Sequence, residues 1–256
     1  LESTDNRHAA RLWHSKLGQP EAVPLLNYIQ IDADNNPGLK MAPLNYRLLV
    51  WKTDGLYYVT NTFPLSMQKL SDHVLLAPDS VQRLGDAIYF LSDQGLMMVD
   101  DSGVRPVSTC IDDTLDELGG PTSLADYQQR TFAVPYRSAR QYLLWTIEKA
   151  EDDSFGDDNE QAFVYSTLAS GFTRFPFGAR CAAVDANTDQ LVLAPTDDNA
   201  LWVERKTLTL ADYCDTEDEA ISTRTVFNDF TEGEPAVMKL VQQCSFLFKE
   251  NSINTI

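Results

Sequence analysis

The three histidines are the first residues to consider for catalysis or metal binding, because an imidazole can act in either role near neutral pH. They are His8, His14 and His73. No two of them have the spacing of a metalloprotease motif, and the chain has no Gly-x-Ser-x-Gly elbow and no phosphate-binding glycine motif. The sequence therefore predicts surface or interfacial histidines, no catalytic residues, and no cofactor-binding or metal-binding residues.

Two acidic loops carry oxygen side chains at alternating positions, as a calcium-binding loop does. They span residues 32–36 and 185–189. In each loop the required glycine is replaced, by Pro37 and Gln190 respectively, and the twelfth position lacks the carboxylate that would chelate the ion. The sequence predicts ordinary turns rich in Asp and Asn at both places.

A short helix is predicted over residues 109–118, ended by Gly119-Gly120. It carries two acidic pairs that resemble a hydrolase acid–base couple, Asp112 with Asp113 and Asp116 with Glu117. Its apolar residues Ile111, Leu115 and Leu118 fall on the opposite face. We therefore interpret the acids as the solvated face of a helix that packs on a sheet.

The cysteines are few and far apart. They are Cys110, Cys181, Cys214 and Cys244. No pair has the spacing of a metal site or a redox motif, so the sequence predicts buried free thiols in a reducing compartment, which fits assembly in a cytoplasm.

The charge balance is strongly acidic, with 20 basic residues against 38 acidic ones and a net charge of −18. Wrapping around nucleic acid is disfavoured, because contacts to phosphates need Lys and Arg. A negative surface would instead repel a passing polyanion, and plain solubility explains the charge equally well. No run of about 18 apolar residues occurs, and the first residues lack a basic and apolar leader, so we expect no membrane anchor and no signal peptide.

Repeated strand–turn–strand units are the elements that must position the histidines, acids and cysteines named above. Residues 49–59 and 88–99 each place two apolar strands around a turn that contains Gly55 or Gly95. Residues 191–203 form a weaker third copy, and residues 142–147, 162–167 and 171–175 supply the strands of another unit. A period of roughly 40 to 50 residues with several short strands is typical of propeller blades, and a β-sandwich of successive hairpins is the alternative.

The predicted fold class is therefore all-β, with β-propeller-like repeated antiparallel blades and one short helix, and the set of blades can be incomplete in this chain. We predict an N-terminal segment over 1–20, a propeller-like domain over 21–210, and a C-terminal β segment over 211–256 that closes the domain or leads to another. The stretch 9–13 fits helix or strand equally well. The stretch 151–160 contains six acids around Gly156 and predicts a solvated hairpin tip.

Several segments, in their order along the chain, resemble the propeller-bearing tail-tube or nozzle proteins of short-tailed bacteriophages. They are residues 18–24, 48–57, 88–95, 102–108 and 203–206, and the pair Asp212-Tyr213. Together they cover roughly residues 18 to 213, most of the chain. Members of this family are usually longer than 256 residues.

The resemblance implies a structural virion protein and no enzymatic activity. It implies copies in a ring, commonly a hexamer, below the portal and its adaptor, with viral DNA passing through the lumen without specific binding. The expected location is the tail of the virion, after assembly in the cytoplasm of the host bacterium.

Two other functions fit the same sequence. A carbohydrate-binding or carbohydrate-cleaving propeller would use aromatic residues to line a sugar cleft, although alternation within strands favours core packing. The aromatic residues concerned are Trp51, Tyr57, Tyr58, Tyr142, Trp145 and Trp202. A scaffold that binds host peptides on a propeller rim is the other alternative.

Overall fold

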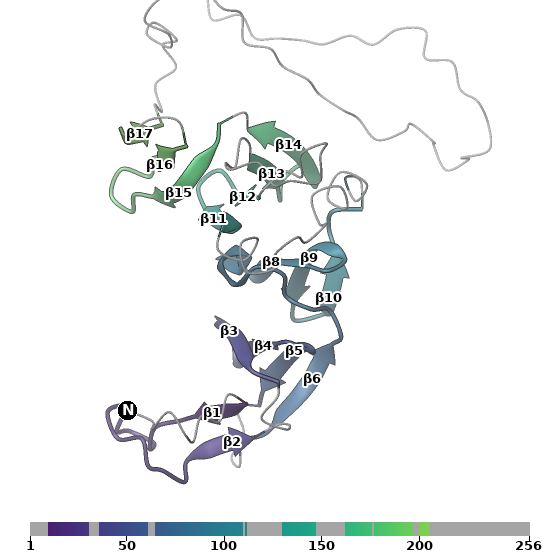
Figure 1. Cartoon of the computed structure of the whole chain (residues 1–256), viewed down its shortest axis with the longest axis vertical. Coiled ribbons are helices and arrows are strands. Elements are labelled where there is room, and N and C mark those ends of the chain that lie inside the picture. Colours follow the sequence, from purple (N-terminus) through teal and green to yellow (C-terminus); the bar gives the residue numbers. More distant parts are fainter. Residues whose placement is uncertain are drawn as a thin grey trace, which may run out of the picture. The chain divides into compact units, whose positions relative to one another are not determined.

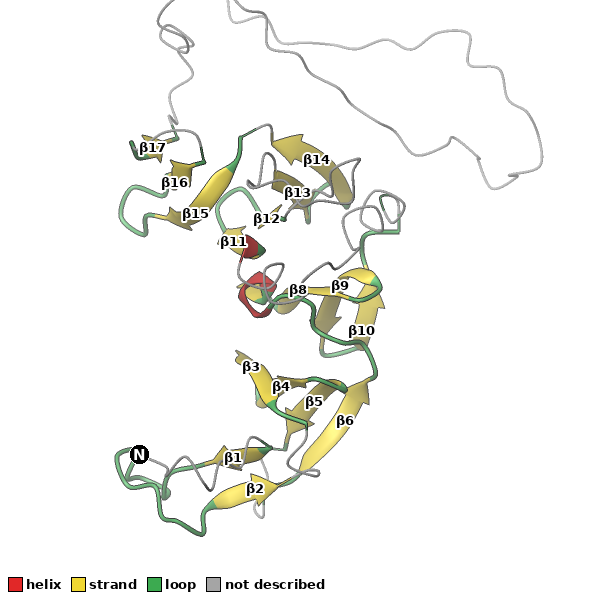
Figure 2. Ribbon diagram, viewed as in Figure 1, coloured by secondary structure: helices red, strands yellow, loops and turns green. Residues whose placement is uncertain are grey.

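The computed structural model describes residues 10–30, 36–60, 65–109, 111, 130–146, 162–175, 177–196 and 200–204. Within them the regular structure is almost entirely β-strand, as Figure 2 shows. The chain divides into two compact units, Leu1–Asp215 and Thr216–Ile256, and every described residue belongs to the first unit.

Four sheets follow one another along the chain, and each is a meander in which consecutive strands pair antiparallel (Figure 1). Sheet I contains β3 (Gly38–Leu44), β4 (Arg47–Lys52), β5 (Gly55–Val59) and β6 (Met67–Ser71). Sheet II contains β7 (Gln82–Leu84), β8 (Ala87–Ser92), β9 (Gly95–Asp100) and β10 (Gly103–Pro106), and the 3-10 helix η1 (Pro78–Ser80) precedes it. Sheet III contains β11 (Phe132–Tyr136), β12 (Gln141–Trp145), β13 (Ala162–Ser166) and β14 (Gly171–Phe175). Sheet IV contains β15 (Ala179–Val184), β16 (Leu191–Pro195) and β17 (Trp202–Val203).

A separate hairpin of β1 (Arg11–Trp13) and β2 (Tyr28–Gln30) precedes the four sheets. Leu12 and Ile29 of this hairpin pack against Val50, Tyr57 and Val59 on one face of sheet I. The ambiguous stretch near residue 12 is therefore a strand. The predicted boundary at residue 20 falls inside this hairpin, because its two strands pair across it.

The sheets recur at the predicted period. Their first strands begin at residues 38, 82, 132 and 179, so consecutive sheets begin 44, 50 and 47 residues apart. The hairpins predicted over 49–59 and 88–99 are the central strand pairs of sheets I and II. Those predicted after residues 142 and 191 are present in sheets III and IV.

The central strands of sheets II and III are buried on both faces, because alternate residues enter two different cores. In β8, Ile88 and Phe90 pack toward sheet I, whereas Tyr89 and Leu91 pack toward sheet III. A strand with no solvent-facing side has no position for polar residues, which accounts for its nearly continuous apolar sequence.

Each interface between neighbouring sheets has its own core. The core between sheets I and II centres on Trp51 and Phe90, whose rings meet edge to face with centroids 5.3 Å apart. The core between sheets II and III contains Tyr89 and Tyr142, and the core between sheets III and IV contains Trp145.

These interfaces confirm the predicted all-β fold of blade-like antiparallel repeats. A two-sheet sandwich has one interface, whereas sheets II and III each have an apolar interface on both faces. Closure of the blades into a propeller ring stays a prediction. The helix predicted over 109–118 lies outside the described residues except at Thr109 and Ile111, and the acidic stretch 151–160 and the segment 211–256 lie outside them entirely.

Glycine closes the central hairpins at a slightly different place from the one that the sequence suggested. Lys52 pairs with Gly55 and Ser92 pairs with Gly95, so each glycine is the first residue of the returning strand rather than part of the two-residue turn. Gly55 has a φ of 142°, in the region that residues with a side chain rarely adopt. An added Cβ there would lie 2.4 Å from the carbonyl oxygen of Ser71.

We expect Gly55→Ala to destabilise the fold more than Gly103→Ala does. Gly103 has a similar φ of 131° but open space where a Cβ would lie, so its substitution carries backbone strain alone, about 1–2 kcal/mol. Gly55→Ala adds the clash with Ser71 and should cost roughly 2–5 kcal/mol. Urea unfolding of both variants measures the difference, and equal losses would contradict this account of Gly55.

Candidate functional site

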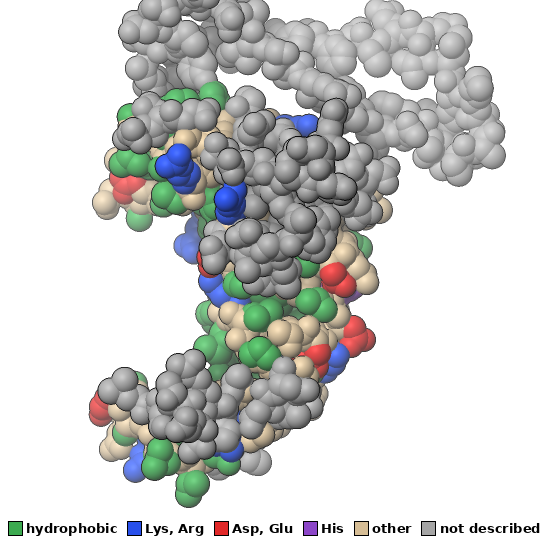
Figure 3. Space-filling model, viewed as in Figure 1, with side chains coloured by type: hydrophobic (Ala, Val, Ile, Leu, Met, Phe, Trp, Pro, Cys, Tyr) green, Lys and Arg blue, Asp and Glu red, His purple; other side chains and the backbone are tan. Residues whose placement is uncertain are grey.

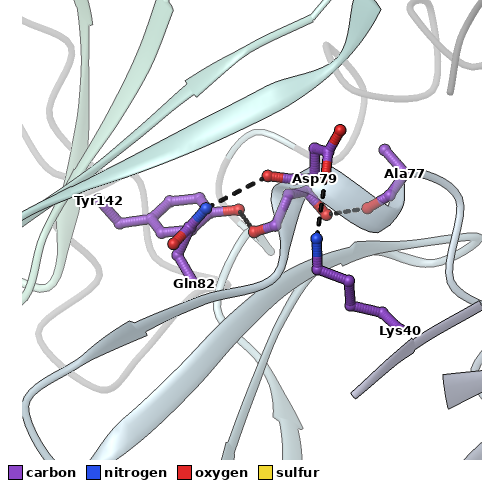
Figure 4. Close-up of polar contacts among 6 residues, drawn as sticks. Lys40, Ala77, Asp79, Gln82 and Tyr142 are labelled. Atoms are coloured by element: carbon purple, nitrogen blue, oxygen red, sulfur yellow. Dashed lines mark hydrogen bonds and ion pairs between the residues drawn. The ribbon is translucent and has the colours of Figure 1, made fainter. Parts of the chain in front are cut away.

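A polar junction at η1 joins three of the sheets (Figure 4). The Ser80 hydroxyl donates to the Ala77 carbonyl at 2.6 Å and accepts from the Leu91 backbone N–H at 2.9 Å. The Ser80 carbonyl accepts a 2.7 Å hydrogen bond from the hydroxyl of Tyr142, which is fully buried on β12. One serine thus satisfies polar groups of sheets II and III where water is excluded.

The exposed side of the same junction reaches sheet I. Lys40 of β3 forms an ion pair with Asp79, with Nζ 2.9 Å from Oδ1. The Gln82 side-chain amide donates to the Asp79 carbonyl at 3.5 Å, the long limit for such a bond. Because the ion pair is exposed to solvent, it adds little stability, and the buried bonds of Ser80 are the stronger part of the junction.

A cavity of about 470 Å³ opens between sheets II and III on the turns that end their hairpins. Arg105 of β10 lines it, together with Arg137 and Arg140 from the β11–β12 turn. On the face drawn in Figure 3, several basic side chains, in blue, lie over the region of β11 and β15. Asp86 and Asp100 also line the cavity, and in a chain of net charge −18 the three guanidinium groups still give it one more positive than negative side chain, which makes it the candidate functional site.

Two other titratable residues of this cavity have shifted pKa values. The hydroxyl and backbone N–H of Ser102 donate to Asp100 and, with Arg105 at 3.2 Å, hold the pKa of Asp100 below its usual 3.8. Burial, reinforced by the neighbouring Tyr165, raises the pKa of Tyr89 to about 12. Asp100 is therefore a carboxylate and Tyr89 a neutral hydroxyl donor at physiological pH.

The turns that carry the arginines are held in place by hydrogen bonds. The Arg140 carbonyl accepts from the backbone N–H of Thr167 at 3.0 Å and from its hydroxyl at 3.1 Å. The Arg140 backbone N–H in turn donates to the Arg137 carbonyl at 3.2 Å. The positions of both Cα atoms are thus fixed by the hairpins of sheet III.

The described histidines lie on separate elements. His14 follows β1 and is half-buried, with Nδ1 3.1 Å from the Ser15 carbonyl oxygen. His73 follows β6 and is half-buried, while His8 lies outside the described residues. Within the part of the chain that the structure describes, no three His, Cys, Asp or Glu side chains are grouped closely enough to hold a metal ion.

The acidic loop at 185–189 is an Asp-initiated turn, as predicted. One Asp185 oxygen accepts from the Asn187 backbone N–H at 2.9 Å, and the other accepts from the Thr188 hydroxyl at 2.8 Å. These bonds lower the pKa of Asp185, and they occupy both of its carboxylate oxygens. The loop at 32–36 lies outside the described residues except for Asn36, and the acidic pairs of 112–117 lie entirely outside them.

The prediction of buried thiols is wrong for Cys181, which is a free but exposed cysteine. A register shift between Ala179 and Cys181 interrupts the alternation of β15. Beyond the shift, Ala182 and Val184 pack into the core, and Cys181 points to the other face. The remaining three cysteines lie outside the described residues.

The aromatic residues considered for a sugar cleft are mainly core residues, as their alternation suggested. Trp51, Tyr57, Tyr142 and Trp145 are buried, Tyr58 is half-buried, and Trp202 is exposed.

The arginine-lined cavity was not predicted from the sequence. A local signal exists in the Arg-Ser-Ala-Arg turn at 137–140, which places two guanidinium groups at one hairpin end. No local signal brings Arg105 or Tyr89 to the same place, because that requires sheets II and III to face each other.

The fold and cavity together define a class: an all-β protein of serially stacked, blade-like meanders. Neither a scan against protein-family models nor a search of curated proteins finds a match to this chain. Among the described residues, no helix is long and apolar enough to cross a membrane.

We expect Ser80→Ala to destabilise the protein by about 1–3 kcal/mol, because the buried Leu91 N–H loses its hydroxyl acceptor. Ser66→Ala is the matched control and should cost less than about 0.5 kcal/mol, since Ser66 is exposed and its hydrogen bonds to the described residues go to the nearby Thr60. Thermal and urea unfolding would compare them, and similar losses in the two variants would contradict the role given to the junction.

Ser102→Ala should raise the pKa of Asp100 toward its usual value, because the largest stabilising hydrogen bond is lost. Since the folded pKa of Asp100 is lowered, its contribution to stability is present above pH 3.8 and is lost as the pH falls through the folded pKa. Carboxyl-carbon NMR titration measures the shift. Asp185 serves as the internal control, because its bonds come from Asn187 and Thr188, and a joint shift of both residues would contradict the assignment.

Proposed function

We propose that this chain is a structural virion protein, a component of the tail tube or nozzle of a short-tailed bacteriophage, with no catalytic role. The observation that carries the proposal is the series of blade-like sheets in which sheets II and III are each buried on both faces by a neighbour. Close packing of this kind resists deformation, which is the mechanical property required of a conduit wall.

The order of the family-like segments supports the same assignment. Residues 48–57 lie in the β4–β5 hairpin, and residues 88–95 lie in the β8–β9 hairpin. These hairpins occupy equivalent central positions in successive sheets. The resemblance therefore follows the structural repeat.

The charge of the chain suits a conduit. A net charge of −18 repels DNA and favours its passage without specific binding. In this proposal the chain forms a ring of copies, a hexamer by analogy with the family, next to the portal and adaptor, after assembly in the host cytoplasm. The sugar-binding alternative is less favoured, because four of its six aromatic residues are in the core.

Purified phage particles test the proposal. An antibody raised against this chain should label the tail end of particles in negative-stain electron microscopy, and mass spectrometry of the same particles should detect the chain in several copies per virion. Deletion of the gene should give particles without a complete tail, and a plasmid copy should restore it. Detection of the full-length product only as a free monomer throughout infection would refute the virion role.

A further inference from the structure

The cavity between sheets II and III has the composition of a binding site for a small anion. Its volume of about 470 Å³ falls within the range of roughly 300–1,000 Å³ that is usual for small-molecule sites. The apolar part of its wall comes from Leu84, Ala87 and Met98. A ligand with an organic body could therefore make van der Waals contact as well as polar contact.

Two of its three arginines have unused binding capacity. Arg105 pairs with Asp100. Arg137 and Arg140, in contrast, form no ion pair with any residue that the structure describes, and both side chains are exposed. Guanidinium groups present several donors in a plane, which matches the oxygen atoms of a carboxylate or a phosphate.

Tyr89 provides an independent indication. Its side chain is only 4% exposed, and it lines the cavity. Its ring is held between Tyr142 and Tyr165, with both centroid distances 5.6 Å. The hydroxyl makes no hydrogen bond to the described residues and is not among their buried unpartnered polar atoms, so it is accessible from the cavity and free to donate to a ligand. A bound oxyanion would supply the acceptor.

We propose that Arg137, Arg140 and the Tyr89 hydroxyl bind the oxyanion group of a small polar ligand, a carboxylate or a phosphate carried on a body about the size of a monosaccharide. Arg105 adds positive charge, while Asp86 and Thr167 on the cavity wall can bind hydroxyl groups of the ligand body. This site is independent of the virion role, because neither requires the other.

Isothermal titration calorimetry on the full chain tests the proposal with four probes. Glucuronate carries a carboxylate on a sugar, glucose 6-phosphate carries a phosphate on a sugar, inorganic phosphate lacks the organic body, and glucose lacks the charge. We expect saturable binding of glucuronate or glucose 6-phosphate, at least about tenfold tighter than either inorganic phosphate or glucose. The preferred probe identifies the source of the oxyanion, and its binding should weaken as salt is raised.

Variants then locate the site. Arg137→Gln and Arg140→Gln should each weaken binding roughly tenfold, and Tyr89→Phe should weaken it several-fold while keeping the tilted ring contacts with Tyr142 and Tyr165. Arg174→Gln is the matched control and should bind normally, because Arg174 is an exposed arginine of sheet III that does not line the cavity. Unfolding curves confirm that each variant is folded.

The outcomes are decisive. Absence of saturable binding by all probes, or binding unaffected by Arg137→Gln and Arg140→Gln, would overturn the site. If inorganic phosphate binds as tightly as the preferred sugar-based probe, the proposal that the ligand carries an organic body is refuted. The two proposals fail independently of each other. If the chain is present in virions but binds no probe, only the anion site is refuted. If it binds a probe but is absent from virions, only the virion role is refuted.

Discussion

The double burial of the central strands is the constraint on which the rest of this structure depends. A four-stranded meander with apolar side chains on both faces cannot be stable in water by itself, because each face needs a neighbouring sheet to exclude solvent. Phe90 and Tyr89, adjacent in sequence, belong to two different cores for this reason. The described sheets are therefore interdependent, and we expect removal of an internal one to expose two apolar faces at once.

The same packing determines how much the polar contacts between the sheets contribute to stability. The hydrogen bonds of Ser80 are buried because sheets II and III approach closely, and in that setting an unpaired group is costly. The arginine-lined cavity has the same origin, since face-to-face stacking places hairpin ends of two sheets beside each other. Arg105 and Arg137 are 32 residues apart in sequence, and only this stacking brings them to one cavity.

Much of the fold could be predicted because its determinants are local. Gly55 and Gly95 mark hairpins, and apolar runs such as 88–91 mark strands buried on both sides. What could not be predicted depends on contacts across sheets or on a local irregularity. The register shift beside Ala179 exposes Cys181, and no composition rule anticipates it. The Ser80–Tyr142 bond joins residues 62 apart, and the cavity likewise required the relative placement of two sheets.

An acidic chain that repels DNA and a pocket that attracts a small anion are physically compatible. Fixed charges at a surface are screened over about 8 Å at physiological ionic strength, so distant carboxylates contribute little inside a cavity with its own guanidinium groups. A duplex experiences the summed field of many acids along its length, whereas a ligand inside the cavity mainly experiences the charges that line it. These are the guanidinium groups of Arg105, Arg137 and Arg140 and the carboxylates of Asp86 and Asp100. A cavity of about 470 Å³ is also far too small to admit a duplex, whose major groove alone is about 12 Å wide. Size and screening together therefore select a small oxyanion over a nucleic acid at this position.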